Sequence, residues 1–150
     1  MYTIMIVDDD PTSLAIGRAL LENDYRLLLK RSGLQALGSL KEGERPDLML
    51  LDMVMPGVDG MEVLKSLKAD PDLRNIPVIF LTGESHVEEE VKSYLSGAAD
   101  FIQKPVNAEM LRIKISQQLR FLELQRENIR LREALRAVKN QVDPWFPQGA

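Results

Sequence analysis

The chain has 150 residues and a mass of 17.0 kDa, enough for one ordinary domain and a short appendage. It is 45% hydrophobic and 28% charged, so neither wholesale disorder nor a fibrous repeat is expected. It contains no cysteine and a single histidine, His86, which excludes disulfides, thiol nucleophiles and multi-histidine metal sites. We expect His86 to lie in a solvent-exposed loop.

Charge divides the chain into an acidic body and a mildly basic end. Residues 1–107 carry a net charge of −7, and residues 108–150 carry +3. This distribution is a poor match for DNA, so we expect no direct nucleic acid binding. Met1–Asp10 turns acidic too early for a signal peptide, and no apolar run approaches the roughly 18 residues of a membrane span. We therefore expect a cytoplasmic protein without membrane contact.

Short strand-forming runs alternate with amphipathic segments as far as residue 107. Two of the runs are continuously apolar, which is typical of strands buried on both faces. Units of this kind joined by short connections predict an α/β fold, a doubly wound five-stranded parallel sheet with flanking helices. In chain order the pattern predicts a strand over Tyr2–Val7, a helix from Thr12, a strand over Tyr25–Leu29, a helix over Gly33–Leu40, a strand over Leu48–Leu51, a helix over Met61–Ala69, a strand over Pro77–Leu81, a helix over Val87–Ser96 and a strand over Asp100–Gln103.

Polar side chains stand at the carboxyl ends of these strands, the edge at which such folds bind ligands. They are Asp8 and Asp9 after the first strand, Asp52 at the end of the third, Thr82 after the fourth and Lys104 after the fifth. At ~4 Å, two carboxylates repel by about 4 kcal/mol at an effective dielectric of 20, so either some are protonated or a cation holds them together. With only oxygen ligands available, Mg²⁺ is the suitable cation and Mn²⁺ a substitute. Phosphate is the natural substrate of such a site.

A carboxylate can act as the nucleophile in phosphoryl transfer and form an aspartyl phosphate. Asp52 is our candidate phosphoacceptor because it ends the central strand, between the acidic pair and Lys104. Asp9 would hold the metal directly, and Asp8 directly or through water. Lys104 would pair with one phosphoryl oxygen, and the Thr82 hydroxyl would donate to another. A single acid at a strand end is usually a helix cap or a solvated loop residue, but the whole ordered set is far more specific.

Taken together, these motifs resemble the receiver domain of two-component response regulators, over roughly residues 1–120. The resemblance implies the strand order 2-1-3-4-5 and Mg²⁺-dependent phosphorylation of the aspartate by a sensor histidine kinase or phosphotransfer protein. It implies that Asp52 and the backbone carbonyl of Val54 join the acidic pair as metal ligands, and that the Lys104-Pro105 peptide is cis. The matching stretches are Ile4–Asp9, Leu51–Gly60, Val78–Gly83 and Lys104-Pro105.

The resemblance also implies a conformational switch. A phosphoryl group on Asp52 would draw Thr82 inward and let Phe101 rotate from an exposed to a buried position, which would alter the surface of the fourth helix, fifth strand and fifth helix. Phenylalanine lacks a hydroxyl to anchor either state, so the coupling would rest on packing. The alternative is that Phe101 is simply a core or interface residue. Val54 and Glu84 would flank the route of an attacking water.

From Asn107, a predicted N-cap, to about Val142 the chain has neither glycine nor proline, which predicts a helix of ~35 residues, roughly 52 Å long. We expect residues 1–120 to form the receiver domain, 121–142 a helical extension and 143–150 a tail. Spacings of three and four in this extension are typical of a coiled coil, with Phe121, Asn128, Leu135 and Val142 at position a and Leu124, Leu131 and Val138 at d.

A single asparagine at an a position favours a parallel two-stranded coiled coil, and so predicts a parallel homodimer through this helix. Glu127 at g and Arg132 at the following e have the spacing of an interchain ion pair. The alternative is one amphipathic helix that packs against its own or another domain. The arginines of this segment alternate with acids, so a solvated helix face is favoured over a nucleic acid surface.

We therefore expect a phosphorylation-driven switch that controls dimerisation or a downstream output domain. Its phosphoryl transfer would be self-catalysed, so we do not expect an enzyme in the usual sense. One alternative is a phosphorylation-independent interaction module with the same fold. A second is a phosphatase of the haloacid-dehalogenase type, but that chemistry requires an acid two residues after the nucleophile, where this chain has Val54.

Overall fold

A computed structural model of the chain describes residues 1–83, 92, 94 and 96–142. His86, Glu84 and most of the helix predicted over Val87–Ser96 lie outside these residues. The strands are Thr3–Val7 (β1), Arg26–Lys30 (β2), Leu48–Asp52 (β3), Val78–Thr82 (β4) and Asp100–Gln103 (β5). The helices are Pro11–Leu21 (α1), Gly33–Lys41 (α2), Gly60–Ala69 (α3) and Ala108–Val142 (α5).

The five strands form one parallel sheet in the order β2-β1-β3-β4-β5, which confirms the predicted fold and topology. For these strands and helices, the expected bounds differ from the observed ones by at most one residue at either end. The shift of β2 has a local cause. The Tyr25 N–H donates to the Leu21 carbonyl at 3.0 Å, so Tyr25 belongs to the turn that ends α1 and the strand begins at Arg26.

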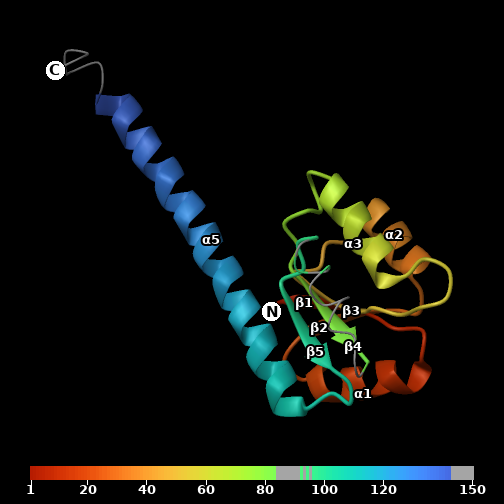
Figure 1. Ribbon diagram of the computed structural model, residues 1–150. Helices are drawn as coiled ribbons and strands as arrows, with labels where there is room; N and C mark the ends of the chain where they lie inside the picture. The colour runs from red at the N-terminus through yellow and green to blue at the C-terminus, as the bar shows by residue number, and fades with distance from the viewer. Residues whose placement is uncertain (84–91, 93, 95, 143–150) are drawn as a thin grey trace.

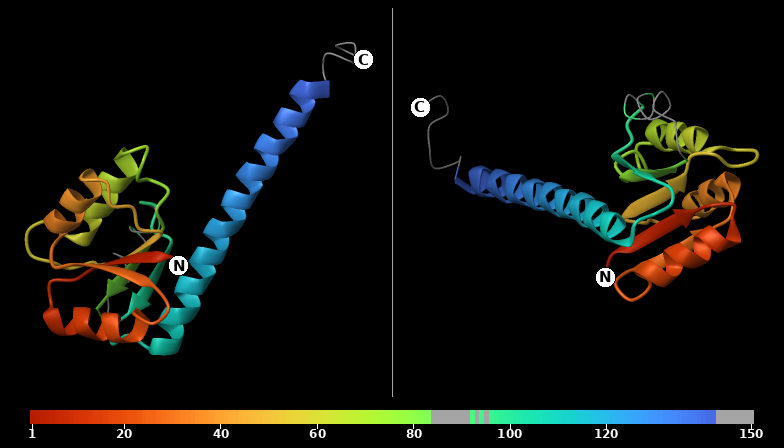
Figure 2. Two further views of the ribbon diagram at one scale, coloured as in Figure 1. Left: turned by 180° about the vertical axis from the view of Figure 1, so that it is seen from behind. Right: turned by 60° about the horizontal axis from the view of Figure 1, so that its bottom comes forward.

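Helices cover both faces of the sheet, as Figures 1 and 2 show. Alternate residues of β1 point to opposite faces: Met5 and Val7 join α2 and α3 in one core, and Ile4 and Ile6 join α1 and the first part of α5 in the other. Every residue of β3 and β4 is buried. Their continuous apolar sequences are therefore explained by burial on both faces, as predicted.

Side-chain caps fix where the helices begin. Asp10 accepts from the Thr12 N–H at 2.9 Å and precedes Pro11, the first residue of α1. Asp59 accepts from the Glu62 N–H at 2.9 Å at the start of α3. At α5 the cap is Asn107, as predicted, and it accepts from the Met110 N–H at 3.0 Å.

The final helix, α5, has 35 residues and confirms the single long helix expected from the sequence. Leu111, Ile115 and Leu119 pack its first part against the sheet, and each is at most 5% exposed. From Arg120 to Gln141 almost every side chain is exposed, and the helix projects away from the body (Figures 1 and 2). Among the described residues, no helix combines the length and the apolar character that crossing a membrane requires.

Gly60 allows α3 to begin directly against the end of β3. A Cβ atom at this position would lie 2.5 Å from the Asp52 carbonyl oxygen and 2.9 Å from Cε1 of Phe80. Backbone and a buried ring cannot give way at that distance, so only glycine fits. By contrast, a Cβ at Gly38 in α2 would meet no heavy atom within 4 Å.

These two glycines predict opposite effects of the same substitution. Gly60→Ala should lower the free energy of unfolding by about 2 kcal/mol through overpacking. Gly38→Ala should raise it by about 0.5–1 kcal/mol, because alanine loses less backbone entropy in a helix. Chemical denaturation monitored by circular dichroism measures both. Equal effects of the two variants would contradict this account of Gly60.

Candidate functional site

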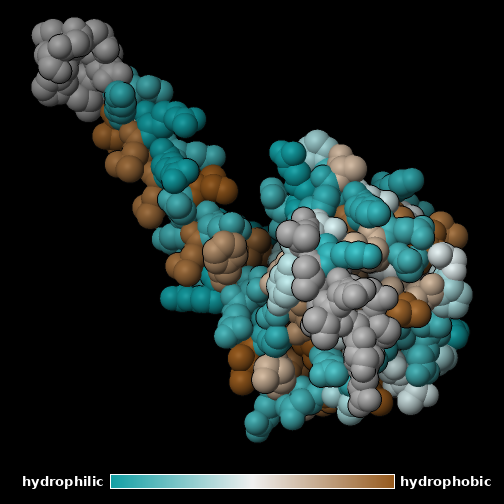
Figure 3. Space-filling view, in the orientation of Figure 1, coloured by the Kyte–Doolittle hydropathy of each residue, from teal (hydrophilic) through white to brown (hydrophobic). Residues whose placement is uncertain are grey.

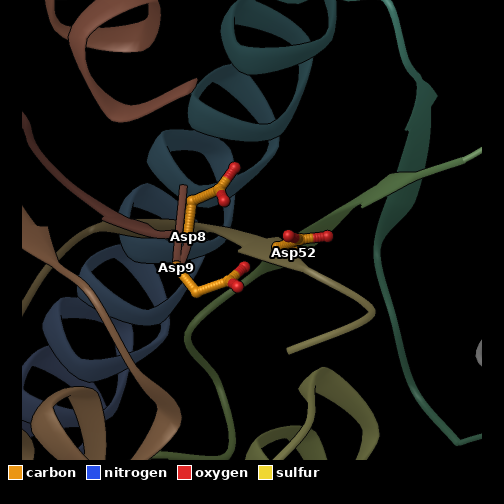
Figure 4. Close-up of side chains that lie close together, drawn as sticks. All are labelled: Asp8, Asp9 and Asp52. Atoms are coloured by element: carbon orange, nitrogen blue, oxygen red, sulfur yellow. The ribbon is translucent and has the colours of Figure 1, made fainter. Parts of the chain in front are cut away.

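Three carboxylates from two strands meet at the carboxyl edge of the sheet. Asp8 and Asp9 directly follow β1, and Asp52 is the last residue of β3, the neighbouring strand. One oxygen from each carboxylate lies within 4.8 Å of the others, and Figure 4 shows the three side chains gathered together. The structure thus brings together the acids that the sequence places at this edge.

Lys104, which directly follows β5, lies at the same edge of the sheet. Its Nζ lies 3.3 Å from Oδ2 of Asp8 and 3.4 Å from Oδ2 of Asp52, so one ammonium group bridges both buried acids. Its backbone N–H donates to the Thr82 carbonyl at 2.7 Å, which ties the end of β5 to that of β4. The Lys104-Pro105 peptide is cis, as the family resemblance implied.

The acidic triplet after β1 divides into different environments. Asp8 is 1% exposed and accepts from the Asp10 N–H at 2.9 Å, whereas Asp9 is exposed. Asp10 turns the other way to cap α1. Asp8 is therefore the buried member of the pair, Asp9 contributes the solvent-facing carboxylate, and Asp10 has a structural role.

Burial and charge shift the ionisation of two groups in the site. Desolvation raises the pKa of Asp52 to about 6, helped by the negative charge of Asp8 and opposed by the ammonium of Lys104. Burial of Lys104 disfavours its charged form, but Asp52 and Asp8 together outweigh this and raise the pKa of the ammonium. At neutral pH the site therefore holds an ionised Asp52 beside a charged Lys104.

The donor atoms of this cluster fit a hard divalent cation. All three side chains offer carboxylate oxygens, two of them buried, and Lys104 supplies only one positive charge to offset them. The backbone of Val54 lies next to the cluster, and its N–H donates to Oδ1 of Asp52 at 3.4 Å. Its carbonyl as a further ligand stays a prediction.

The two residues expected to switch are both buried. Thr82 ends β4 and is fully inaccessible. Phe101 is 6% exposed: its ring stacks on Phe80 at a centroid distance of 5.9 Å and meets the edge of Tyr94 at 4.3 Å. Phe101 therefore occupies the buried one of the two positions expected for it, and its rotation on phosphorylation stays a prediction.

A polar network beside Phe101 was not anticipated from the sequence. Nζ of Lys114 on α5 donates to Oδ1 of Asp100 at 2.9 Å and to the Phe101 carbonyl at 2.7 Å, and the Tyr94 hydroxyl lies 3.3 Å from the same Oδ1. These groups come from three separate segments. No local spacing in the sequence signals their meeting.

The raised pKa of Asp52 predicts a pH-dependent penalty on folding. The pKa of this carboxyl is near 3.8 in the unfolded chain and near 6 in the folded one. The free energy of unfolding therefore falls as pH rises from about 4 to about 6, and it stays at the lower value above pH 6. Asp52→Asn removes this penalty and should be more stable than the parent at pH 7 by about 2 kcal/mol, with little difference at pH 4.

Urea denaturation at several pH values, in the presence of a metal chelator, measures this difference. The matched control is Asp72→Asn, which neutralises an exposed acid far from the cluster and should show no such pH-dependent gain. If the stability advantage of Asp52→Asn over the parent grew as the pH was lowered, the raised pKa of Asp52 would be contradicted.

Comparison with known proteins agrees with this geometry. The family model described as "Response regulator receiver domain" matches residues 4–116. The chain is 39% identical over 106 residues to the polar-differentiation response regulator DivK of Brucella anthropi, which covers 70% of this chain and 85% of DivK. A receiver domain protein from Clostridium thermocellum superposes with a TM-score of 0.77 at 28% identity, covering 83% of this chain and 99% of that one.

Two of the relatives are much longer than this chain. A probable cyclic di-GMP phosphodiesterase of Vibrio cholerae is 42% identical over 113 residues, 75% of this chain but 25% of the relative. The response regulator PleD of Caulobacter vibrioides is 35% identical over 132 residues, 87% of this chain and 29% of PleD. The chain thus spans only about a quarter of the length of these two proteins. Its match to the family model, its strand order and its acidic edge together show that it belongs to the response regulator receiver family.

Proposed function

We propose that Asp52 accepts a phosphoryl group from a histidine kinase or phosphotransfer protein in a Mg²⁺-dependent reaction. The observation that carries this proposal is the position of Lys104, whose Nζ lies within 3.4 Å of both Asp8 and Asp52. A lysine held at that point can pair with a phosphoryl oxygen on Asp52. Proteins of this family typically accept phosphoryl groups and switch in response.

The proposed reaction is a direct transfer to the carboxylate. An oxygen of ionised Asp52 forms a bond to phosphorus as the nitrogen–phosphorus bond of the donor's phosphohistidine breaks, and the leaving imidazole takes up a proton. Lys104 and the Thr82 hydroxyl would hold phosphoryl oxygens. Asp8, Asp9, Asp52 and the Val54 carbonyl would hold Mg²⁺. Its positive charge would offset the negative charge of the carboxylate and phosphoryl oxygens.

The transfer would be self-catalysed, with the donor protein supplying the phosphoryl group. The haloacid-dehalogenase alternative lacks its second acid, because Val54 occupies that position with an exposed apolar side chain. The name of the Vibrio cholerae relative describes a protein of which this chain covers a quarter, and it does not bear on the chemistry at Asp52.

An apolar cavity of about 280 Å³ adjoins the site and is a candidate contact for the phosphoryl donor. Lys104 and Asp8 line this cavity, and so does Ile16 of α1, whose side chain is 53% exposed. A donor protein seated there would place its phosphohistidine close to Asp52. This position favours α1 as part of the docking surface.

The effect of phosphorylation would reach the rest of the chain through the two buried residues Thr82 and Phe101. A phosphoryl oxygen that attracts the Thr82 hydroxyl would disturb the packing around Phe101, and Lys114 joins the backbone of Phe101 to α5. We propose residues 1–120 as the phosphorylated unit and 121–142 as the contact for a second copy of the chain, followed by a tail over 143–150.

Phosphorylation from a small donor tests the central step. Incubation with acetyl phosphate and Mg²⁺ should add the mass of one phosphoryl group to the intact chain. Asp52→Asn should show no gain, because the amide is not a nucleophile, whereas the matched control Asp72→Asn should react like the parent. A phosphoryl gain that persists in Asp52→Asn would refute the assignment.

Metal binding gives an independent prediction. Because Mg²⁺ binds only the folded cluster, saturating Mg²⁺ should raise the free energy of unfolding, by about 2.7 kcal/mol at a hundredfold excess over Kd. Asp9→Asn should lose most of this gain, since it removes the solvent-facing ligand, and Asp72→Asn should keep it. Thermal denaturation with and without Mg²⁺ measures the effect, and equal stabilisation of both variants would argue against this site.

A further inference from the structure

The projecting part of α5 has two faces that differ in what they contact. On one face, Nη2 of Arg126 pairs with Oδ1 of Asp47 at 3.0 Å, and the other oxygen of Asp47 accepts from the Thr3 N–H at 2.8 Å. This ion pair joins the helix to the amino-terminal edge of the sheet. It therefore identifies the side of α5 that faces its own domain.

The other face carries an exposed apolar stripe. Phe121, Leu124, Leu131, Leu135 and Val138 are each between 52% and 70% exposed, and Figure 3 shows apolar side chains along this part of the helix among hydrophilic ones. These residues occupy positions a and d of the heptad pattern, whereas Arg126 falls at f. Position f lies opposite the a/d stripe on a helix, and the exposure of the five apolar side chains shows that the domain itself leaves them uncovered.

We propose that a second copy of this chain covers the stripe, and that the two α5 helices form a parallel coiled coil with the receiver domains on its outside. Asn128 lies within the stripe at an a position, where paired asparagines fix a parallel two-stranded register. The proposal does not depend on phosphorylation of Asp52, and it is tested on the unmodified chain.

Charges beside the stripe favour the parallel orientation. In a parallel pair, Glu127 at g of one helix faces Arg132 at e of the other, twice by symmetry. Among the described residues, Glu127 pairs within its own chain at a long distance, 3.9 Å from Nη2 of Arg130. An antiparallel pair would instead bring the e positions together, where Arg132 and Lys139 would repel.

The first test compares two substitutions that are alike in chemistry and exposure. Leu131 at d and Ile129 at b are both 56% exposed on the same helical turn. Sedimentation velocity of the full chain over a range of concentrations should show a dimer for the parent. Leu131→Lys should weaken the association about 100-fold or more, since it places charge in the seam. Ile129→Lys should leave it within about twofold.

The second test reads the orientation. Because the chain has no cysteine, Leu124→Cys introduces a single thiol in the seam. In a parallel, in-register pair the two thiols face each other and should form an interchain disulfide on mild oxidation. In an antiparallel pair centred on the stripe they would lie about 20 Å apart, at 1.5 Å per residue.

Three results would overturn the proposal. The first is a parent chain that stays monomeric at every concentration, which would leave the stripe to another partner. The second is a dimer that Leu131→Lys and Ile129→Lys weaken equally, which would place the contact on another surface. The third is a dimer in which Leu124→Cys forms no interchain disulfide.

Discussion

Like charges crowded at one edge of the sheet are the constraint on which this structure depends. The ends of β1 and β3 are neighbours, so the carboxylates at these ends lie close together. Burial makes their charge more costly, and this is why the pKa of Asp52 rises to about 6. In such a site the carboxylates repel one another, and a bound cation or a lysine ammonium group reduces this repulsion.

Lys104 offsets part of this repulsion, and several other residues of the fold position it and Asp52. The lysine reaches Asp8 and Asp52 because the end of β5 is tied to Thr82 through its backbone. Gly60 lets α3 begin against the Asp52 backbone, and Asp10 leaves the cluster to cap α1. The same few residues therefore hold the sheet edge together and arrange the chemistry.

Much of this fold follows from patterns that are local in the sequence. The continuous apolar runs of β3 and β4 indicate burial on both faces, and parallel topology then brings Asp8, Asp52 and Lys104 to one edge. What could not be read from the sequence are contacts between distant segments. The pairing of Arg126 with Asp47 joins residues 79 positions apart, and the ring of Phe101 meets that of Tyr94, which lies outside β5.

The most direct test of the central claim is to locate the phosphoryl group chemically. An aspartyl phosphate is an acyl phosphate, so borohydride reduces it to homoserine, which peptide sequencing by mass spectrometry can place at a single position. After phosphorylation with acetyl phosphate and Mg²⁺, the account predicts homoserine at position 52 alone. Homoserine at Asp8 or Asp9 with an unaltered Asp52, or a phosphoryl group found on a side chain outside the cluster, would contradict it.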